Sequence, residues 1–423
     1  NSIMAQKATA AAIYEVLTIS KDGKEVPLQG KTINFNYYES LYSPVVTANM
    51  MFVDAGGTTP DKKENLTSIK DGLPITALED VKVKIQTKFG TLDFTKDAFK
   101  VTSSPIMDQE SNRQTVLLNL VNDKEIKNSE IPIFDRFVGK ISDTVTKILL
   151  QKLGITMDKI HVESTKNSYG VTGKSRGALN IILDLCRRSV PVKGDAGYFF
   201  FQTQDGFNFK SIDSLLSQES KQKYVYSGAL RENLENSDND FKILMSPRLK
   251  KDQDITKALK NGTYVNRNVF FNPQTFEHSE IVFSVDKDGV KKTLGGDLPV
   301  KPKDVKGFTK TNHHILDIGS FETQNQNPNN DPREWQATSQ MRYNLLHSII
   351  MNIQVPCNTE LRAGDVVEID IESQQDDKVD SPSDEQQSGK YLILHLCHHF
   401  DTLRSFTSLT LVRDSYGVRR SKD

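Results

Sequence analysis

The sequence has few cysteines and no long apolar run. Only 36% of its residues are hydrophobic, and no uninterrupted stretch approaches the length that crosses a bilayer, so we expect no membrane insertion. The alanine-rich residues 8–12 lack the charged and apolar regions of an export signal, and none is expected. An odd number of irregularly spaced cysteines predicts reduced thiols in a protein made in the cytosol, not a disulfide framework: Cys186, Cys357 and Cys397.

The sequence also lacks an excess of either charge. Its 54 basic and 55 acidic residues give a net charge of −1, so no overall field attracts nucleic acid, and only a local basic patch could do so. The basic residues at 419–422 are too few to indicate nucleic-acid binding by themselves. Composition therefore argues against a general nucleic-acid-binding protein.

The first part of the chain reads as antiparallel strands. At 423 residues the chain exceeds one hydrophobic core and should divide into about two to four domains. Residues 13–121 alternate apolar and polar side chains, which predicts strands with one buried and one wet face. We interpret them as a small barrel or sandwich with a hairpin turn at residues 21–24 and a long loop at residues 56–72. The expected strands are residues 13–19, 32–38, 45–53, 81–87 and 114–121.

After residue 131 the apolar period changes from two to 3.6 residues. Residues 134–153 place apolar side chains along one face of a helix, which Gly154 should stop. A second helix is expected over residues 178–186, and residues 198–209 read as a hairpin, so this region is a small α/β domain. The aromatic side chains of the hairpin are interpreted as core, with a subunit interface as the alternative.

A second β region is discontinuous in the sequence. It begins near Tyr224 and is interrupted by residues 251–331, a charged segment with Gly-, Pro- and Asn-rich parts. A helix then has a strong start signal, because Asp331 can cap it, Pro332 suits its first position and Glu334 completes a capping box. The chain ends in three predicted strands, residues 366–371, 391–400 and 405–412.

This closing segment resembles a known family. The residues that carry the resemblance are Leu361-x-x-Gly364-Asp365-Val366-Val367, then Ser388-Gly389-Lys390-Tyr391-Leu392-Ile393, a histidine at 395 or 398, and Thr407-x-Leu409-x-Leu411-x-Arg413. Their order is similar to the closing strands of the tail-hub family. Its members are the trimeric hub proteins of contractile phage baseplates, related to the hub portion of type VI secretion spikes.

The resemblance covers about residues 14–418 and is weakest over residues 250–331. It implies an α+β, mostly β fold with two tube-like antiparallel β-barrel domains, a small α/β domain and an insertion domain. The implied boundaries are residues 8–123 for the first barrel, 124–222 for the α/β domain, 223–250 with 332–418 for the second barrel, and 251–331 for the insertion. We find no sequence identity between the two barrel regions that would prove a duplication.

The resemblance also implies partners. Three chains with two similar barrels each would present six barrels around an axis, and so match a hexameric tube to a trimeric spike. The implied partners are two further copies in a homotrimer, the trimeric central spike protein, the tail tube protein and surrounding baseplate proteins. A tape-measure protein and DNA would pass through the channel only as cargo. The implied location is the tail baseplate of a virion, after synthesis in the host cytoplasm.

Two motifs point to other chemistry. Residues 170–175 are similar to the end of a phosphate-binding loop, but Ser168 stands where a glycine is required, so we favour an ordinary helix entry. On a strand, His395, Cys397 and His399 would point to one face and His398 to the other, so three zinc ligands could converge. Because no second cluster lies nearby in sequence, buried or interface histidines are the favoured interpretation.

We therefore expect a structural protein that is not an enzyme, and we assign no catalytic, cofactor-binding or metal-binding residue. The alternatives are a metal-dependent cell-wall hydrolase that uses residues 395–399 and a receptor-binding tail protein. The acidic residues between 373 and 388 read as a solvated loop. A channel lining without strong positive charge is expected, because it would let DNA pass without phosphate adhesion.

Overall fold

The computed structural model describes most of the chain: residues 8–57, 59–60, 66–110, 113–226, 238–252, 254–290, 292–296, 298, 307–308, 310–316, 331–372, 383–384 and 386–416. Most of the expected acidic loop and the whole basic tail, residues 373–382 and 419–422, lie outside these residues. None of the helices in the described ranges is both long enough and apolar enough to cross a membrane.

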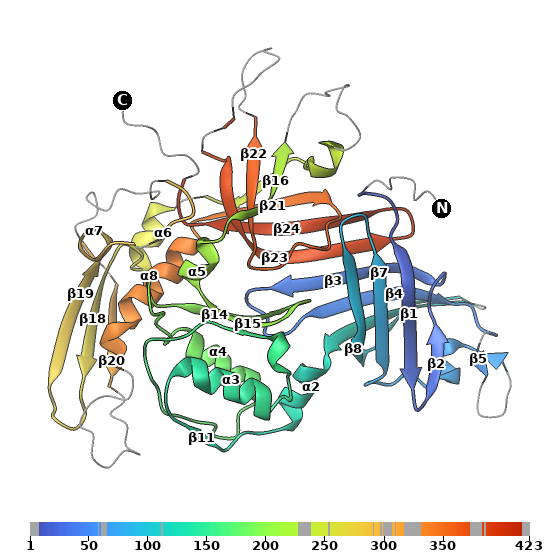
Figure 1. Cartoon of the computed structure of the whole chain (residues 1–423), viewed down its shortest axis with the longest axis horizontal. Helices are drawn as coiled ribbons and strands as arrows, with labels where there is room; N and C mark the ends of the chain where they lie inside the picture. Colours follow the sequence, from blue (N-terminus) through green and yellow to red (C-terminus); the bar gives the residue numbers. More distant parts are fainter. Residues whose placement is uncertain are drawn as a thin grey trace.

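The described chain is mostly β and is built around one 14-stranded sheet (Figure 1). Strands from the first part of the chain form one side of this sheet, which we call the N-sheet, in the order β3-β4-β10-β8-β7-β1-β2, with β9 paired to β10. The N-sheet strands are β1 (Ile13–Lys21), β2 (Lys24–Pro27), β3 (Thr32–Ser40), β4 (Thr47–Asp54), β7 (Asp80–Gln86), β8 (Thr91–Ser103), β9 (Ile106–Gln109) and β10 (Gln114–Asn122).

The N-sheet confirms the five expected strands and adds β2, β8 and β9. The hairpin turn between β1 and β2 has Asp22 and Gly23 at positive φ, as a two-residue hairpin requires. Sequence alternation missed β8 because its pairing with β7 slips between Phe94 and Phe99, which breaks the period of two. Short elements fill the expected loop after β4: β5 (Thr59–Pro60), β6 (Leu66–Thr67) and α1 (Ile69–Gly72).

Strands from the later part of the chain form the other side, which we call the C-sheet. β22, β23 and β24 follow one another as antiparallel neighbours, as the closing residues predict. The C-sheet elements are β16 (Ser220–Tyr226), the 3-10 turn Asp238–Phe241, β17 (Arg248–Lys251), β21 (Ile349–Pro356), β22 (Val366–Ile371), β23 (Gly389–Asp401) and β24 (Ser405–Arg413). The ladders of both sheets run in open order over the described residues, so closure into two complete barrels stays a prediction.

The two sheets repeat one connection pattern. Six strands of the N-sheet belong to the repeat, and in chain order they are β1, β3, β4, β7, β8 and β10. In the sheet they lie in the order β1-β7-β8-β10-β4-β3. The C-sheet strands β16, β17, β21, β22, β23 and β24 lie as β16-β22-β23-β24-β21-β17, which is the same permutation. Only the first ladder differs in sense, since β1 is antiparallel to β7 whereas β16 is parallel to β22.

Irregularities also fall at equivalent positions of the two sheets. The ladder of β8 with β10 skips one residue at Thr102, and the ladder of β23 with β24 skips one at Leu394. A turn residue with positive φ lies two residues before β7 and two residues before β22, the equivalent strands of the two sheets. These residues are Leu78 with φ of 68° and Gly364 with φ of 87°. The N–H of each turn residue donates to the carbonyl just before the bulge, on Val101 and Ile393 respectively. Because bulges and turns are specific features of a strand pair, the two sheets are two versions of one pattern.

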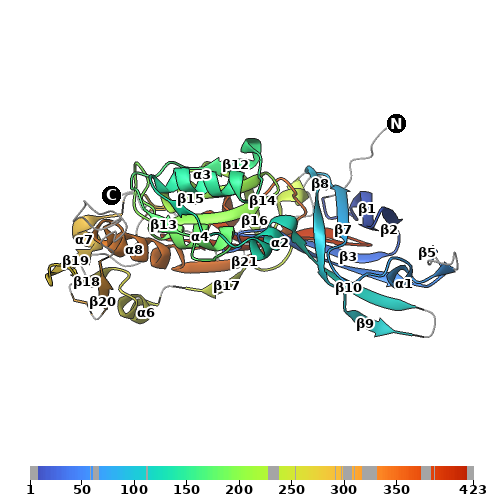
Figure 2. The same cartoon turned by 90° about the horizontal axis from the view of Figure 1, so that it is seen from below.

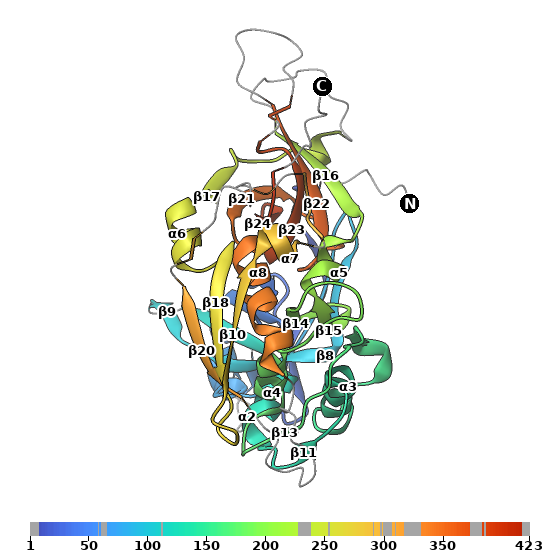
Figure 3. The same cartoon turned by 90° about the vertical axis from the view of Figure 1, so that its left-hand side faces the viewer.

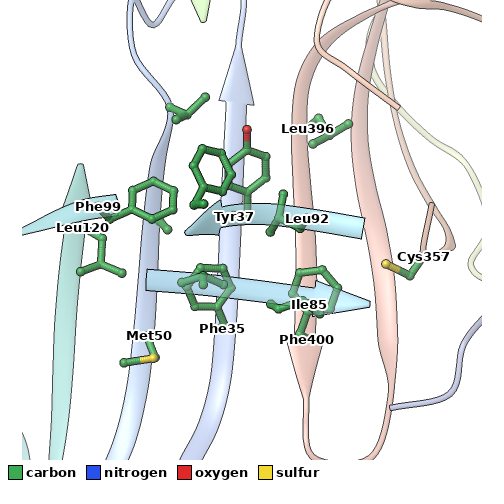
Figure 4. Packing of buried hydrophobic residues seen from close by; sticks show 14 of the residues in the cluster. Phe35, Tyr37, Met50, Ile85, Leu92, Phe99, Leu120, Cys357, Leu396 and Phe400 are labelled. Carbon is green, nitrogen blue, oxygen red and sulfur yellow. The ribbon is translucent and has the colours of Figure 1, made fainter. Parts of the chain in front are cut away.

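The two sheets share one hydrophobic core. Phe35, Tyr37 and Met50 of the N-sheet pack in the same cluster as Leu396 and Phe400 of the C-sheet (Figure 4). The core face of each strand alternates with an outer face, as antiparallel sheets with one wet side require. The α+β, mostly β fold is thus confirmed, while the expected domain boundaries stay predictions.

A small α/β unit follows the N-sheet. Its helices pack on the hairpin β14–β15 around a second core cluster. The unit comprises α2 (Asp123–Glu130), β11 (Arg136–Phe137), α3 (Ile141–Gln151), the 3-10 turn Met157–Lys159, β12 (Ile160–Val162), β13 (Val171–Thr172), α4 (Ala178–Cys186), β14 (Tyr198–Thr203), β15 (Gly206–Ser211) and α5 (Ile212–Leu216). The hairpin aromatics, Tyr198, Phe199, Phe200, Phe201, Phe207 and Phe209, are all buried, which agrees with the core interpretation.

The helix expected over residues 134–153 is wrong at its start. α3 begins only at Ile141, because Gly139 has φ of 117°, which no α-helix includes, and Phe137 pairs in a short ladder with β13. The preceding helix α2 was not anticipated, since its sequence is polar almost throughout. Its start is capped by Asn122, whose side chain accepts a hydrogen bond from the N–H of Lys124 at 3.0 Å.

An insertion separates β17 from β21. It forms a three-stranded sheet that packs on α8, beside which it lies in Figure 3. The start signal at Asp331 is confirmed as a cap, but it opens a 3-10 turn before the helix proper. The elements are α6 (Ile255–Lys260), β18 (Val265–Phe271), β19 (His278–Ser284), α7 (Val285–Asp288), β20 (Thr311–Ile315), the 3-10 turn Pro332–Glu334 and α8 (Gln336–Leu346).

A buried arginine ties three of these parts together. Arg342 on α8 is 1% exposed, and its guanidinium donates to Asp213 of α5 and to Asp414 just after β24, the latter at 3.4 Å. Both carboxylates are themselves buried. The α/β unit, α8 and the C-sheet are therefore held by one charged cluster inside the protein.

Candidate functional site

The N-sheet and the C-sheet meet in an antiparallel ladder between β3 and β23, which we call the seam (residues 34–40 and 395–401). β23 is 13 residues long, and its first part pairs with β22 while its second part continues along β3. Its opposite edge pairs with β24. The seam thus makes the two repeats one continuous surface, with one face in the shared core and one face outside.

On the core face, Tyr37 and His398 lie directly opposite each other across the seam. Their rings stack with centroids 6.0 Å apart, and neither side chain is exposed. His398 Nδ1 lies 2.9 Å from the Thr407 hydroxyl of β24, and burial lowers the pKa of His398 to about 3. His398 is therefore a neutral core residue at physiological pH.

Glu39, two residues after Tyr37 on β3, connects the seam by hydrogen bonds to the α/β hairpin and to the turn before β22. Its carboxylate accepts hydrogen bonds from the Tyr37 hydroxyl at 2.8 Å, the Gln204 N–H at 2.9 Å and the Ala363 N–H at 2.8 Å. Burial raises the pKa of Glu39 to about 7, although the positive charge of Arg362 and these hydrogen bonds oppose the rise. One side chain therefore joins the N-sheet, the α/β hairpin and the turn before β22.

The outer face of the seam is polar but almost free of charge. Across β3, β4, β23 and β24, the outward positions in this ladder region are Asn34, Asn36, Tyr38, Ser40, Thr47, Asn49, Met51, Val53, His395, Cys397, His399, Asp401, Phe406, Ser408 and Thr410. Burial lowers the pKa values of His395 and His399, so both are neutral near pH 7. Asp401 is then the charged member of this set, which we call the polar face.

The polar face is hollowed beside β17. A cavity of about 460 Å³ lies over the seam and is lined by Tyr38, His395 and Cys397 together with Met245 and Arg248. Arg248 brings a positive charge to the rim of the hollow, whereas the side chains along the seam itself bring none. The hollow lies on the outer surface of the sheet, between the seam and the start of β17.

The structure places the candidate metal ligands without gathering them around an ion. His395 and His399 engage strand neighbours, since their Nδ1 atoms lie against the Ser40 hydroxyl at 2.7 Å and the Asn36 carboxamide oxygen. Burial raises the pKa of the Cys397 thiol to about 11, which disfavours the thiolate that zinc requires. Within the described ranges, no group of three or more His, Cys, Asp or Glu side chains is placed to hold a metal ion.

The segment similar to a phosphate-binding loop is filled by protein. A Cβ at Gly173 would lie 2.1 Å from the Ile133 carbonyl, so the backbone here packs against its neighbour and does not surround a cavity. At the start of α4, the N–H of Leu179 donates to the Asn128 side chain at 2.8 Å. The interpretation as an ordinary helix entry agrees with these contacts.

Comparison with known proteins identifies the fold. No protein-family model and no curated protein matches the sequence. The tail protein from Neisseria meningitidis MC58 has a TM-score of 0.54 and 9% identity, covering 94% of this chain and 96% of that chain. The 43 kDa tail protein of prophage MuSo2 from Shewanella oneidensis has a TM-score of 0.52 and 9% identity, covering 95% and 98%.

The chain therefore has the fold of phage tail proteins, which confirms the predicted resemblance at the level of the fold. A component of the type VI secretion system of E. coli has a lower TM-score of 0.45 at 10% identity, covering 95% of this chain and 79% of that chain.

Sequence reasoning had anticipated the strands of the polar face but not the seam. The available signal was the length of the run from Tyr391 to Phe400, which exceeds what one hairpin partner needs.

Proposed function

We propose that this chain is the structural baseplate hub protein of a contractile phage tail. Three copies would form a ring with pseudo-sixfold symmetry that adapts the hexameric tail tube to the trimeric central spike and leaves an axial channel. The observation that carries the proposal is the internal repeat: the N-sheet and the C-sheet share strand permutation, bulge and turn geometry. The fold likeness to phage tail proteins supports it.

The physical use of the repeat is to change symmetry. A closed ring requires each subunit to present the same pair of complementary surfaces, and a chain with two equivalent units supplies two of them. Three such chains offer six near-equivalent sheets to one neighbour and three identical chains to another. The proposed partners are the tail tube protein, the trimeric spike protein and surrounding baseplate proteins, with a tape-measure protein as cargo of the channel.

The polar face suits the lining of the channel. Its side chains are mainly amides, hydroxyls and neutral imidazoles, so a DNA backbone meets hydrogen-bonding groups without a row of cations that would hold its phosphates. The neutral side chains of the polar face have the character expected of a channel that lets DNA pass without phosphate adhesion. We therefore propose that this face points to the axis and that DNA is a passing cargo.

The decisive experiment is the mass of the assembly. Native mass spectrometry and electron microscopy of the full chain, alone and with tube and spike proteins, should give a three-copy ring with sixfold features on one side. A stable monomer both alone and with the tube and spike proteins, or a ring of another copy number, would overturn the proposal. Concentration must be varied, because a ring held by weak contacts dissociates on dilution.

The channel assignment has its own test. The double variant Asn36→Lys and Ser408→Lys adds two cations to the polar face, and Gln274→Lys with Thr275→Lys adds two at exposed positions of the insertion. Rings of the first variant should retain double-stranded DNA in low salt at least tenfold more tightly than wild type, whereas the second should change little. Equal retention by both variants would contradict an axial polar face.

A further inference from the structure

The strand edges that form the seam have equivalents in the opposite repeats, and these equivalent edges are not paired with each other within one chain. In the C-sheet, the edge of β23 beyond β22 is covered by β3. The equivalent edge in the N-sheet lies on β8 and β9 beyond Lys100, where pairing with β7 ends, and no described strand covers it. Likewise β17, the equivalent of β3, pairs with β21 on one side and ends the sheet on the other. Each sheet thus has one half of a seam without its counterpart.

Because both sheets skip one residue at the same place, each residue of one repeat can be matched to an equivalent residue of the other. Counting from Leu394 and Thr102, position 398 of β23 corresponds to position 106 of β9, and both lie opposite core positions, Thr407 and Val116. Counting from the ladders of β4 and β21, Tyr37 corresponds to Leu249. The seam pair His398–Tyr37 is therefore equivalent to a pair of Ile106 with Leu249.

Burial separates the completed pair from the incomplete one. His398 and Tyr37 are both 0% exposed, whereas Ile106 is 40% exposed and Leu249 is 43% exposed. Both apolar side chains belong to the core face of their sheets, since they lie opposite the buried residues Val116 and Met351. An apolar core position left open at the edge of a sheet is a site for pairing with another strand.

The two edges are also complementary in charge. Asp108 lies two residues after Ile106 on β9, beyond the skipped residue of its ladder with β10, and Arg248 directly precedes Leu249 on β17. The antiparallel register of the seam therefore brings these opposite charges to neighbouring positions. Two further lysines lie beyond Leu249 on β17. Figures 2 and 3 show β9 and β17 apart in one molecule, so one chain does not bring its own two edges together.

We propose that the seam repeats between copies: β17 of one subunit pairs antiparallel with β9 of the next, and places Leu249 opposite Ile106. This inference rests on the ring of the proposed function and names its subunit interface. The occupant of each edge is a second copy of this chain, because the in-chain seam already shows the same strands of the repeat paired. The interface is heterologous, with different edges on the two sides, and it closes when three chains complete six repeats.

Cysteine cross-linking tests the register. In the double variant Ile106→Cys and Leu249→Cys, residues directly opposite on neighbouring strands come within reach of a short bismaleimide, because their Cβ atoms lie about 4.5–5.5 Å apart. The expected product under denaturing conditions is a covalently closed trimer. The matched control is Ile106→Cys with Val282→Cys, since Val282 is 46% exposed but lies on β19 of the insertion.

The outcomes separate the interface from the ring. No cross-link in a variant that still assembles into trimers would overturn the interface and leave the proposed function standing. A ladder of ever longer products would keep the strand pairing and overturn the closed ring. A protein that stays monomeric at every concentration, with and without its spike, would overturn both.

A second measurement does not depend on cross-linking. Ile106→Lys and Leu249→Lys should each raise the concentration at which the ring dissociates by at least tenfold, because each buries a charge in an apolar seam. The melting temperature of the dilute monomer should be unchanged, since both side chains are exposed there. Val282→Lys is the control. Assembly of both seam variants at the wild-type concentration would overturn the interface.

Discussion

The N-sheet and the C-sheet follow one pattern with almost entirely different residues. Both place a positive-φ turn before a strand, a bulge at the same position and a large buried side chain before it, Phe99 in one and Tyr391 in the other. They differ at their edges: β3 has nine residues and is paired on both sides, whereas β17 has four and is paired on one. The two repeats therefore share the backbone geometry of their central strands, and they differ in the length and pairing of their edge strands.

The largest expected effect concerns the buried charged cluster at the end of the C-sheet. Asp414 follows β24 and binds Arg342, while the equivalent Asp123 begins α2 after its cap Asn122. Arg342→Met should lower the free energy of unfolding by about 3–5 kcal/mol, because it leaves Asp213 and Asp414 buried without their cation. In the N-sheet, Asn122→Ala removes the cap beside the equivalent Asp123 and should cost about 0.5–2 kcal/mol. Denaturant titration checks both, and equal losses would contradict the difference.

The next comparison uses equivalent positions inside and outside the completed seam. Tyr37→Ala should cost about 3–5 kcal/mol of stability, because a fully buried ring stacked on His398 is removed and a cavity remains. Leu249→Ala should cost the monomer less than about 1 kcal/mol, since its side chain is partly exposed there. Thermal unfolding of dilute protein measures the pair. A large loss from Leu249→Ala in the monomer would show that this edge is already covered within one chain.

A third test concerns the lock at Glu39, which has no carboxylate counterpart in the C-sheet seam edge β17. Its pKa in the folded state is about 7, above the ordinary value of 4.5 for a glutamate, so the folded protein binds the proton more tightly than the unfolded chain. This contribution to stability is present below pH 4.5 and is lost as the pH rises through 7. Wild type should therefore lose stability between pH 5 and pH 7.5 relative to Glu39→Gln.

The measurement is the free energy of unfolding of both proteins at the two pH values. Glu39→Gln should also cost about 1–3 kcal/mol at low pH, because an amide nitrogen replaces an acceptor of a buried N–H. Comparison with this variant cancels the titration of His398, which both proteins share. Parallel pH profiles for the two proteins would mean that Glu39 does not titrate in this range.

The smallest expected effects compare the two turns. Gly364→Ala should destabilise by about 1–2 kcal/mol, because φ of 87° disfavours any Cβ, which here would also lie 3.0 Å from the Phe201 ring. Leu78→Gly should be neutral or stabilise by up to about 1 kcal/mol, since it relieves the same strain at φ of 68° in a half-exposed side chain. The melting temperature should fall for Gly364→Ala, and it should rise or stay unchanged for Leu78→Gly. A drop for both would contradict the equivalence.

Much of the local structure was predictable. The two-residue alternation predicted β1, β3, β4, β7 and β10, and the closing strands were predicted nearly to their ends, because each has one face in the core and one in water. The period failed where local geometry intervened, at the slipped pairing of β8 and at Gly139, which delays α3. α2 was missed because a polar helix held by its cap has little apolar period to detect.

The polar face was predictable only in part. The alternation on residues 395–399 indicated that His395, Cys397 and His399 share a face, and the structure places them there. It did not indicate that their neighbours would be Ser40, Tyr38 and Asn36 of β3, which share no sequence signal with them. The internal repeat was equally hidden, since its equivalent positions keep burial and register without keeping residue identity.

The sequence by itself determined most of the strands, their buried faces, most of the helices and the scarcity of charge at the outward positions of β3, β4, β23 and β24. These features follow from side-chain period and chemistry over a few neighbouring residues. Only the tertiary structure decided that Ser40 and His395, 355 residues apart, meet across the seam, and that Glu39 lies in a buried lock. Pairing between distant strands depends on backbone hydrogen bonds that every residue offers alike, so the side-chain pattern cannot name the partner.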